Sequence, residues 1–135
     1  KSVNDRFGHA VGDKVISAFA KQLHDAVSEN HIAGRIGGEE FAVILPGVDG
    51  ASARLFAEGI RSAFAAAAIE GAPTDLRPTA SFGVAELTRT DTLSDMLRRA
   101  DLALYEAKDA GRDCVRVARP YFSAGSEERR ALRDG

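Results

Sequence analysis

Apolar residues recur at intervals of three and four positions in three stretches of the chain, residues 13–28, 51–69 and 93–110. This spacing places the apolar side chains on one face of an α-helix. The predicted buried face of the last helix comprises Leu93, Met96, Leu97, Ala100, Ala103, Leu104 and Ala107. We therefore predict three amphipathic helices, each with one face against the core of the protein.

The residues that flank these stretches are typical of helix ends. Asp13 stands at the predicted start of the first helix, where the helix dipole favours a carboxylate. Either Asp49 or Ser52 is suited to cap the second helix, because a short oxygen-bearing side chain can accept a hydrogen bond from the first turn. Gly111 follows the third helix and is suited to its C′ position.

Short apolar runs between the helices predict β-strands. They are residues 33–36, 41–45, 79–87 and 114–117. Strands that alternate with helices indicate an α/β or α+β fold, in which helices cover a sheet. We place the domain at residues 1–118. Residues 119–135 are charged and poorly apolar, which predicts a C-terminal tail.

A glycine pair separates the first two strand-like runs. Gly37 and Gly38 suit the tight turn of a β-hairpin, because such turns need a positive φ at their central residues. Glu39 and Glu40 follow directly, so two carboxylates stand at an exposed tip. Mg²⁺ commonly shares its coordination shell between carboxylates and substrate phosphates. The tip is therefore either a divalent-cation site or a solvated turn with two surface glutamates.

Composition excludes several classes of function. The 135 residues are enough for one domain with one core. A net charge of −2 provides no basic field of the kind that attracts nucleic acid without regard to sequence. No apolar stretch approaches the roughly 18–20 residues of a membrane span. The single cysteine, Cys114, cannot form an internal disulfide and fits a reducing cytoplasm.

Four separated blocks of sequence make the chain similar to a known family. They are residues 1–5 with Gly8, His9, Gly12 and Asp13; residues 35–41; residues 80–85; and residues 100–108 with Gly111 and Arg112. In this order and spacing they resemble the GGDEF domain of bacterial diguanylate cyclases, which join two GTP molecules into cyclic di-GMP. The signature here reads Gly-Gly-Glu-Glu-Phe, and the resemblance spans residues 1 to about 117.

The resemblance implies a ferredoxin-like palm, related to those of nucleotide cyclases and polymerases, with a central, mostly antiparallel sheet flanked by helices. It also implies attack by a ribose 3′-hydroxyl on an α-phosphorus, with pyrophosphate leaving. Proteins promote such reactions mainly by positioning and by charge neutralisation with metal ions. By resemblance, Glu39 is a ligand of Mg²⁺ (or Mn²⁺) and helps to deprotonate the hydroxyl, and Glu40 supports the same site.

The family's substrate contacts fall on matching residues of this chain. Asn4 and Asp13 match a guanine-recognition pair, and a carboxylate can accept hydrogen bonds from guanine N1–H and the 2-amino group, which adenine does not offer. A simpler interpretation of Asp13 is a helix cap, and the two roles can coexist. The other substrate-binding positions implied by the resemblance are Lys1, His9, Gly38, Lys108 and Arg112. For His9 two roles stay open, contact with the nucleotide or ordering of the loop.

Polar residues on the last helix predict a functional stripe. Asp101, Tyr105, Lys108 and Arg112 follow one another at steps of four, three and four. By resemblance, Lys108 and Arg112 grip the β- and γ-phosphates; alternatively, they only complement the negative end of the helix. We expect Asp101 and Tyr105 to hold the helix in place, and Arg35 to brace the hairpin or a phosphate.

Three departures from the family pattern bear on function. The chain begins at Lys1, after the family's first helix and a central strand that carries another metal-binding aspartate. We therefore expect the natural protein to continue upstream and these 135 residues alone to be inactive or nearly so. Ser28 and His31 stand where many relatives have the arginine and aspartate of an inhibitory product site, so we expect no product inhibition there. Asp113 replaces the family's usual Asn, which the sequence does not explain.

The expected protein is a cytoplasmic homodimer in which each protomer presents one GTP, with an upstream sensory or receiver domain. GTP and cyclic di-GMP are its expected ligands. Two rivals remain open. One is a catalytically silent module that binds GTP or cyclic di-GMP as a sensor or interaction domain. The other is a cyclase that makes an adenylyl or mixed product, which Asp13 disfavours.

Overall fold

The structure is a computed structural model that describes residues 6–119. Helices and strands alternate along them. In chain order the elements are α2 (His9–Ala26), β1 (Ile32–Gly37), β2 (Glu40–Ile44), α3 (Gly50–Ala66), β3 (Phe82–Val84), α4 (Leu93–Asp109) and β4 (Val115–Val117). Each of the three predicted helices and four predicted strands is present, so the predicted mixed architecture is confirmed.

The strands form two small sheets rather than the one central sheet that the family resemblance implies. β1 pairs antiparallel with β2, and β3 pairs parallel with β4. The strand predicted over residues 79–87 is reduced to Phe82–Val84, because β4 supplies a ladder of only three residues. Within residues 6–119, no strand pairing joins the two sheets.

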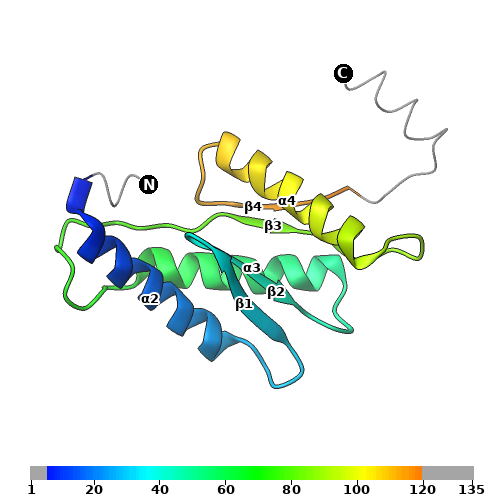
Figure 1. Ribbon diagram of the computed structural model, residues 1–135, viewed down its shortest axis with the longest axis horizontal. Coiled ribbons are helices and arrows are strands. Elements are labelled where there is room, and N and C mark those ends of the chain that lie inside the picture. The colour runs from blue at the N-terminus through cyan, green and yellow to red at the C-terminus, as the bar shows by residue number, and fades with distance from the viewer. Residues whose placement is uncertain (1–5, 120–135) are drawn as a thin grey trace.

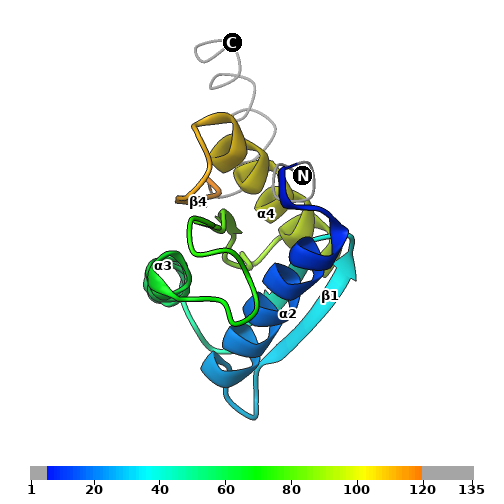
Figure 2. The same cartoon turned by 90° about the vertical axis from the view of Figure 1, so that its left-hand side faces the viewer.

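The two sheets are held together by helices and by a group of aromatic rings. Figure 1 shows α4 lying along β3 and β4, and α3 passing behind the β1–β2 hairpin; Figure 2 shows α2 and α3 side by side with α4 above them. The ring of Phe19 on α2 lies 5.3 Å from Phe41 of β2, 5.2 Å from Phe64 of α3 and 6.2 Å from Phe82 of β3, measured between centroids. These separations suit favourable aromatic contacts. Phe19 therefore links both sheets to α3.

The start of α2 differs from the sequence prediction, whereas the start of α3 agrees with it. α2 begins at His9 rather than at residue 13, and its N-cap is Gly8, whose carbonyl accepts a hydrogen bond from the backbone N–H of Gly12 at 3.1 Å. Asp13 thus lies inside the helix, and its predicted capping role is wrong. For α3 the cap is Asp49, whose carboxylate accepts a hydrogen bond from the backbone N–H of Ser52 at 2.8 Å. The same hydrogen bond lowers the pKa of Asp49.

The packing of α4 uses fewer apolar residues than its periodicity predicts. Ala103 and Ala107 are buried, but Leu93 and Leu97 are 52% and 43% exposed, which corrects the predicted buried face. Small residues dominate this contact because the backbone of β3 approaches α4 closely at Gly83. Gly111 follows the C-cap Ala110, so its predicted C′ position is confirmed.

The start of α4 is fixed by a capping box. Thr92 Oγ1 accepts a hydrogen bond from the backbone N–H of Asp95 at 3.1 Å, and Asp95 Oδ2 accepts one from the backbone N–H of Thr92 at 3.0 Å. Reciprocal bonds of this kind satisfy two donors that the helix would otherwise leave unpaired. They lower the pKa of Asp95.

We expect Thr92→Ala to lower the free energy of unfolding by about 1 kcal/mol, because the first turn of α4 loses its side-chain cap. Urea unfolding followed by circular dichroism measures the change. Thr90→Ala is the matched control, since Thr90 is exposed in the preceding turn and has no side-chain hydrogen bond to the residues the structure describes. Equal stability of the two variants would contradict the assigned cap.

None of the helices formed by residues 6–119 combines the length and the apolar character needed to cross a membrane.

Candidate functional site

The acidic tip of the hairpin is a two-residue turn. Gly37 pairs with Glu40, so the turn consists of Gly38 and Glu39 rather than of the predicted Gly37–Gly38 pair. The register shifts between Arg35 and Gly37, which moves the turn by one residue. Gly38 has φ 51°, which glycine adopts at no steric cost. Glu39 therefore lies in the turn itself, and Glu40 is the first residue of β2.

Arg35 braces this turn. Its Nε donates a hydrogen bond to the carbonyl oxygen of Gly38 at 2.7 Å, and its Nη2 donates to the same oxygen. Two donors from one planar guanidinium hold the carbonyl in a defined direction. Of the two roles that the sequence left open for Arg35, the structure favours the brace.

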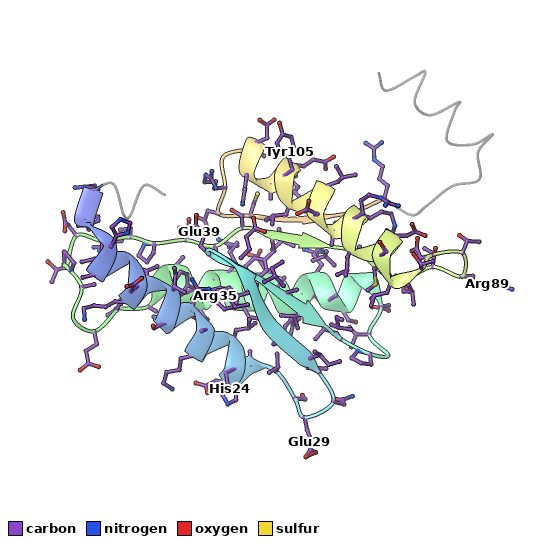
Figure 3. All side chains as sticks on the ribbon, in the orientation of Figure 1. His24, Glu29, Arg35, Glu39, Arg89 and Tyr105 are labelled. Atoms are coloured by element: carbon purple, nitrogen blue, oxygen red, sulfur yellow. The ribbon has the colours of Figure 1, made fainter. Side chains whose placement is uncertain are left out.

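An ion pair joins the acidic tip to the last turn of α4. Lys108 Nζ lies 3.3 Å from Glu40 Oε2, although 68 residues separate the two in sequence. Both side chains are partly exposed, at 33% and 43%, so the pair is open to solvent and to a ligand. In Figures 1 and 3 the tip that carries Glu39 is directed toward the unit formed by α4, β3 and β4. Carboxylates and a lysine thus share one end of the molecule.

The predicted stripe on α4 is only partly present. The helix ends at Asp109, and Arg112 lies in the loop that follows, with φ 65°. The cause is Gly111, where the chain leaves the helical direction. Tyr105 is 68% exposed on the outer side of α4, and Asp101 is also exposed. The prediction that these two residues hold the helix in place is therefore wrong within the described part of the chain.

The loop after α4 is tied to α3 by charged residues that the sequence analysis did not identify. Arg61 of α3 donates from Nη1 to Asp113 Oδ1 at 2.6 Å. It also donates to Glu58, from Nε to Oε1 at 2.9 Å and from Nη2 to Oε2 at 2.5 Å. These bonds raise the pKa of Arg61 and lower that of Glu58. The one available signal in the sequence was the unexplained aspartate at position 113.

The residues implied in guanine recognition make no contact with the Glu40–Lys108 pair within residues 6–119. His9 and Asp13 are exposed on the first turns of α2, four positions apart and therefore on one face. Asp13 lines a surface hollow of about 760 Å³ between α2 and the chain that follows α3. Lys1 and Asn4, the other two implied substrate contacts in this region, lie outside the described residues.

The turn before β1 contains the two residues that replace the inhibitory arginine and aspartate. The backbone N–H of Ser28 donates to His31 Nδ1 at 3.0 Å, and the His31 ring lies edge-on to Phe56 with centroids 6.0 Å apart. His31 is therefore engaged in local contacts.

Glu39 and Glu40 are the carboxylates that suit a divalent cation best. The described residues contain no group of three or more His, Cys, Asp or Glu side chains that could hold a metal. Two carboxylates are nevertheless the usual protein share of a Mg²⁺ shell that is completed by water and by substrate phosphates. The residues present therefore fit a metal bound together with a nucleotide, and they do not form an all-protein cage.

Comparison with known proteins gives one consistent family. The family model "Diguanylate cyclase, GGDEF domain" matches residues 1–114. Diguanylate cyclase VdcA of Vibrio cholerae is 41% identical over 118 residues, which cover 85% of this chain and 35% of that protein. The solved active GGEEF domain of a diguanylate cyclase from Vibrio cholerae is 36% identical with a TM-score of 0.80, covering 88% of this chain and 76% of that one. The GGDEF domain of DgcB from Caulobacter crescentus, solved in complex with c-di-GMP, is 30% identical with a TM-score of 0.77. The match covers 86% of this chain and 70% of that one.

These matches show the fold of the chain and the share of its relatives' length that it spans. The likeness to the solved domains confirms the predicted α+β fold. The chain spans between 18% and 38% of the length of the curated relatives that it matches first.

Proposed function

The chain belongs to the GGDEF domain family of diguanylate cyclases, and from this membership we propose that the natural protein condenses two GTP molecules into cyclic di-GMP and pyrophosphate. The observation that carries the proposal is the Glu40–Lys108 ion pair. In this pair, one of the two carboxylates suited to a metal lies beside a cation suited to phosphate. A triphosphate bound there would meet both kinds of group at once.

The reaction forms one bond and breaks one bond at each α-phosphorus. The ribose 3′-oxygen attacks phosphorus, its proton passes to a carboxylate, and pyrophosphate leaves; a second, equivalent step closes the ring. Proteins favour such steps by positioning and by stabilising charge. Glu39 lies in the turn and accepts the proton, and Arg35 fixes that turn through Gly38.

The remaining site residues bind the substrate. Glu39 and Glu40 would hold a Mg²⁺ or Mn²⁺ ion, which would neutralise phosphate charge. Gly38 has no Cβ and nothing within 4 Å of where one would be, so phosphates can approach the backbone of the turn. The side chains assigned to the triphosphate are Lys108 and Arg112. Those assigned to the guanine and its surroundings are Lys1, Asn4, His9 and Asp13.

We extend the proposal to the assembly. One site of this kind holds one GTP, so two protomers must face each other for the two nucleotides to react, and the active form is a homodimer. The domain occupies residues 1–118, followed by a tail. The protein acts in the cytoplasm under the control of an upstream sensory or receiver domain.

The decisive experiment incubates the natural protein, with any residues that flank these 135, with GTP and Mg²⁺ and separates the products by chromatography. We expect cyclic di-GMP and pyrophosphate in a ratio of one to two. GTP that is bound but not consumed would instead identify a silent sensor module. If GTP were neither bound nor consumed, both the cyclase and the sensor assignment would be overturned.

We expect Asp13→Ala to weaken the preference for GTP over ATP, because guanine N1–H and the 2-amino group lose their acceptor. The loss in kcat/KM for GTP should be roughly 10- to 100-fold, as for other unpaired polar groups at a binding site. Steady-state kinetics with GTP and with ATP measure it. Asp25→Ala is the matched control, since Asp25 is an exposed aspartate on the same helix that pairs only with Lys21 among the described residues, at 3.2 Å. Equal effects of the two substitutions would contradict the assignment.

A further inference from the structure

Two consecutive residues of the loop after α4 adopt a backbone conformation that non-glycine residues rarely take. Arg112 has φ 65° and Asp113 has φ 48°, and they are the only non-glycine residues with positive φ in the described part of the chain. Such residues persist only where the surrounding structure holds them, and they occur often at functional sites. This strain is located at the residue to which the proposed function assigns phosphate binding.

Three contacts with three different parts of the fold hold this loop. The backbone N–H of Arg112 donates to the carbonyl of Ala107 in α4 at 2.9 Å. The backbone N–H of Asp113 donates to Ser81 Oγ, just before β3, at 3.1 Å. The carboxylate of Asp113 accepts from Arg61 of α3 at 2.6 Å. The first two contacts are ordinary neutral hydrogen bonds, whereas the third is charge-assisted and therefore the strongest.

Arg61 is a rigid partner for this contact. Its side chain is only 20% exposed, and Glu58 engages the other edge of its guanidinium through two hydrogen bonds. A planar guanidinium held on both edges has little freedom to move. Asp113 is thus anchored to a helix, α3.

The side chain of Arg112, unlike that of Arg61, is not held by neighbouring groups of the described residues. Its side chain is exposed and makes no hydrogen bond or ion pair with residues 6–119. It remains available to a ligand while its backbone is fixed by the residue next to it. Binding then costs less conformational entropy than it would from a loose loop, because the start of the side chain is already in place.

We propose that the Arg61–Asp113 ion pair is a positioning device that fixes the backbone of Arg112 so that its guanidinium is presented to the β- and γ-phosphates of GTP. Arg61 and Asp113 act through Arg112 and do not touch the substrate. The pair also accounts for the aspartate at position 113, since a carboxylate beside a phosphate site would repel the ligand unless a cation neutralised it. This inference rests on the proposed function, because it presupposes that Arg112 binds phosphate.

The test is a double-mutant cycle on the natural protein, with the affinity for an α,β-methylene analogue of GTP as the measured quantity. The analogue retains the β- and γ-phosphates but cannot be cyclised. Asp113→Gly removes the carboxylate without adding strain, because glycine adopts φ 48° freely, and it leaves the backbone at this position unanchored. We expect about a fivefold higher Kd in the otherwise unchanged protein and less than about a twofold change in the Arg112→Ala background, because coupled residues are non-additive.

Two further measurements separate positioning from a general structural effect. GMP lacks the β- and γ-phosphates, so its Kd should stay within about twofold in every variant. Asp113→Asn keeps an oxygen to which Arg61 can donate but loses the charge, so its Kd for the analogue should lie between those of the original protein and of Asp113→Gly. Asp75→Ala, which removes an exposed pair with Arg6 at 3.3 Å, is the remote control and should change nothing.

The outcomes distinguish this inference from the function on which it rests. Unchanged affinity in Asp113→Gly, an equal loss in both backgrounds, or an equal loss for GMP would overturn the positioning role and leave the cyclase assignment intact. Absence of analogue binding, or an Arg112→Ala protein that binds as tightly as the original, would overturn the phosphate role of Arg112 and this inference with it.

Discussion

Glu39→Gln is expected to reduce cyclic di-GMP formation at least about 100-fold while the protein continues to bind GTP. The substitution keeps the size of the side chain but removes the charge that we propose to hold a metal and the group that we propose to accept the 3′-hydroxyl proton. The substitution leaves in place the cations at Lys108 and Arg112 and the base contact proposed for Asp13, so nucleotide affinity should fall far less than kcat. Steady-state turnover and calorimetric GTP binding, measured on the same preparations, give both quantities.

Glu29→Gln provides the matched control for this experiment. It makes the same chemical change on an exposed glutamate in the loop before β1, at the end of the hairpin opposite to Glu39 in Figure 3. We expect its turnover to equal that of the unsubstituted protein. If Glu39→Gln kept full activity, the acidic turn would not be the catalytic centre. If the unsubstituted protein bound GTP without turnover, the substitution would have no activity to remove, and the silent-module alternative would hold.

The sequence predicted where the helices lie better than where they begin. Apolar spacing identifies a face, and each predicted helix is present. It did not locate the start of α2, because Gly8 caps the helix through its backbone and leaves no side-chain signal. Asp49 was predictable as a cap because its carboxylate accepts the hydrogen bond. Burial was overestimated on α4, where Leu93 and Leu97 fit the apolar period but remain largely exposed.

In the candidate site, features formed by neighbouring residues were predictable, whereas contacts between residues far apart in the sequence were not. The hairpin and its two carboxylates could be read from adjacent residues, although the register shift near Arg35 moved the turn by one position. The Glu40–Lys108 and Arg61–Asp113 pairs join residues 68 and 52 positions apart. Local spacing does not specify which helix a hairpin will meet, so neither contact was predictable from the pattern. The resemblance supplied Lys108 and Arg112 as phosphate contacts but gave no role to Arg61.

Gly83→Ala is expected to be strongly destabilising. A Cβ at Gly83 would overlap the carbonyl oxygen of Ala100 and the backbone nitrogen of Leu104, and would lie 2.9 Å from Leu104 Cα. These atoms belong to the backbone of α4, so no side-chain rotation can relieve the overlap. Either α4 or β3 must move. We expect the free energy of unfolding to fall by about 3 kcal/mol or more, which urea unfolding measures.

The same substitution should also impair turnover, because α4 carries Lys108 to its contact with Glu40. Gly59→Ala separates this effect from the general consequence of replacing a glycine. Gly59 lies on the exposed side of α3 with nothing within 4 Å of the place that a methyl group would take, so alanine there should raise stability by up to about 1 kcal/mol through its higher helix propensity. Opposite signs for the two variants are the expected result. A Gly83→Ala protein as stable as the original would show that β3 and α4 do not pack as closely as their backbones indicate, and the position assigned to Lys108 would lose its support.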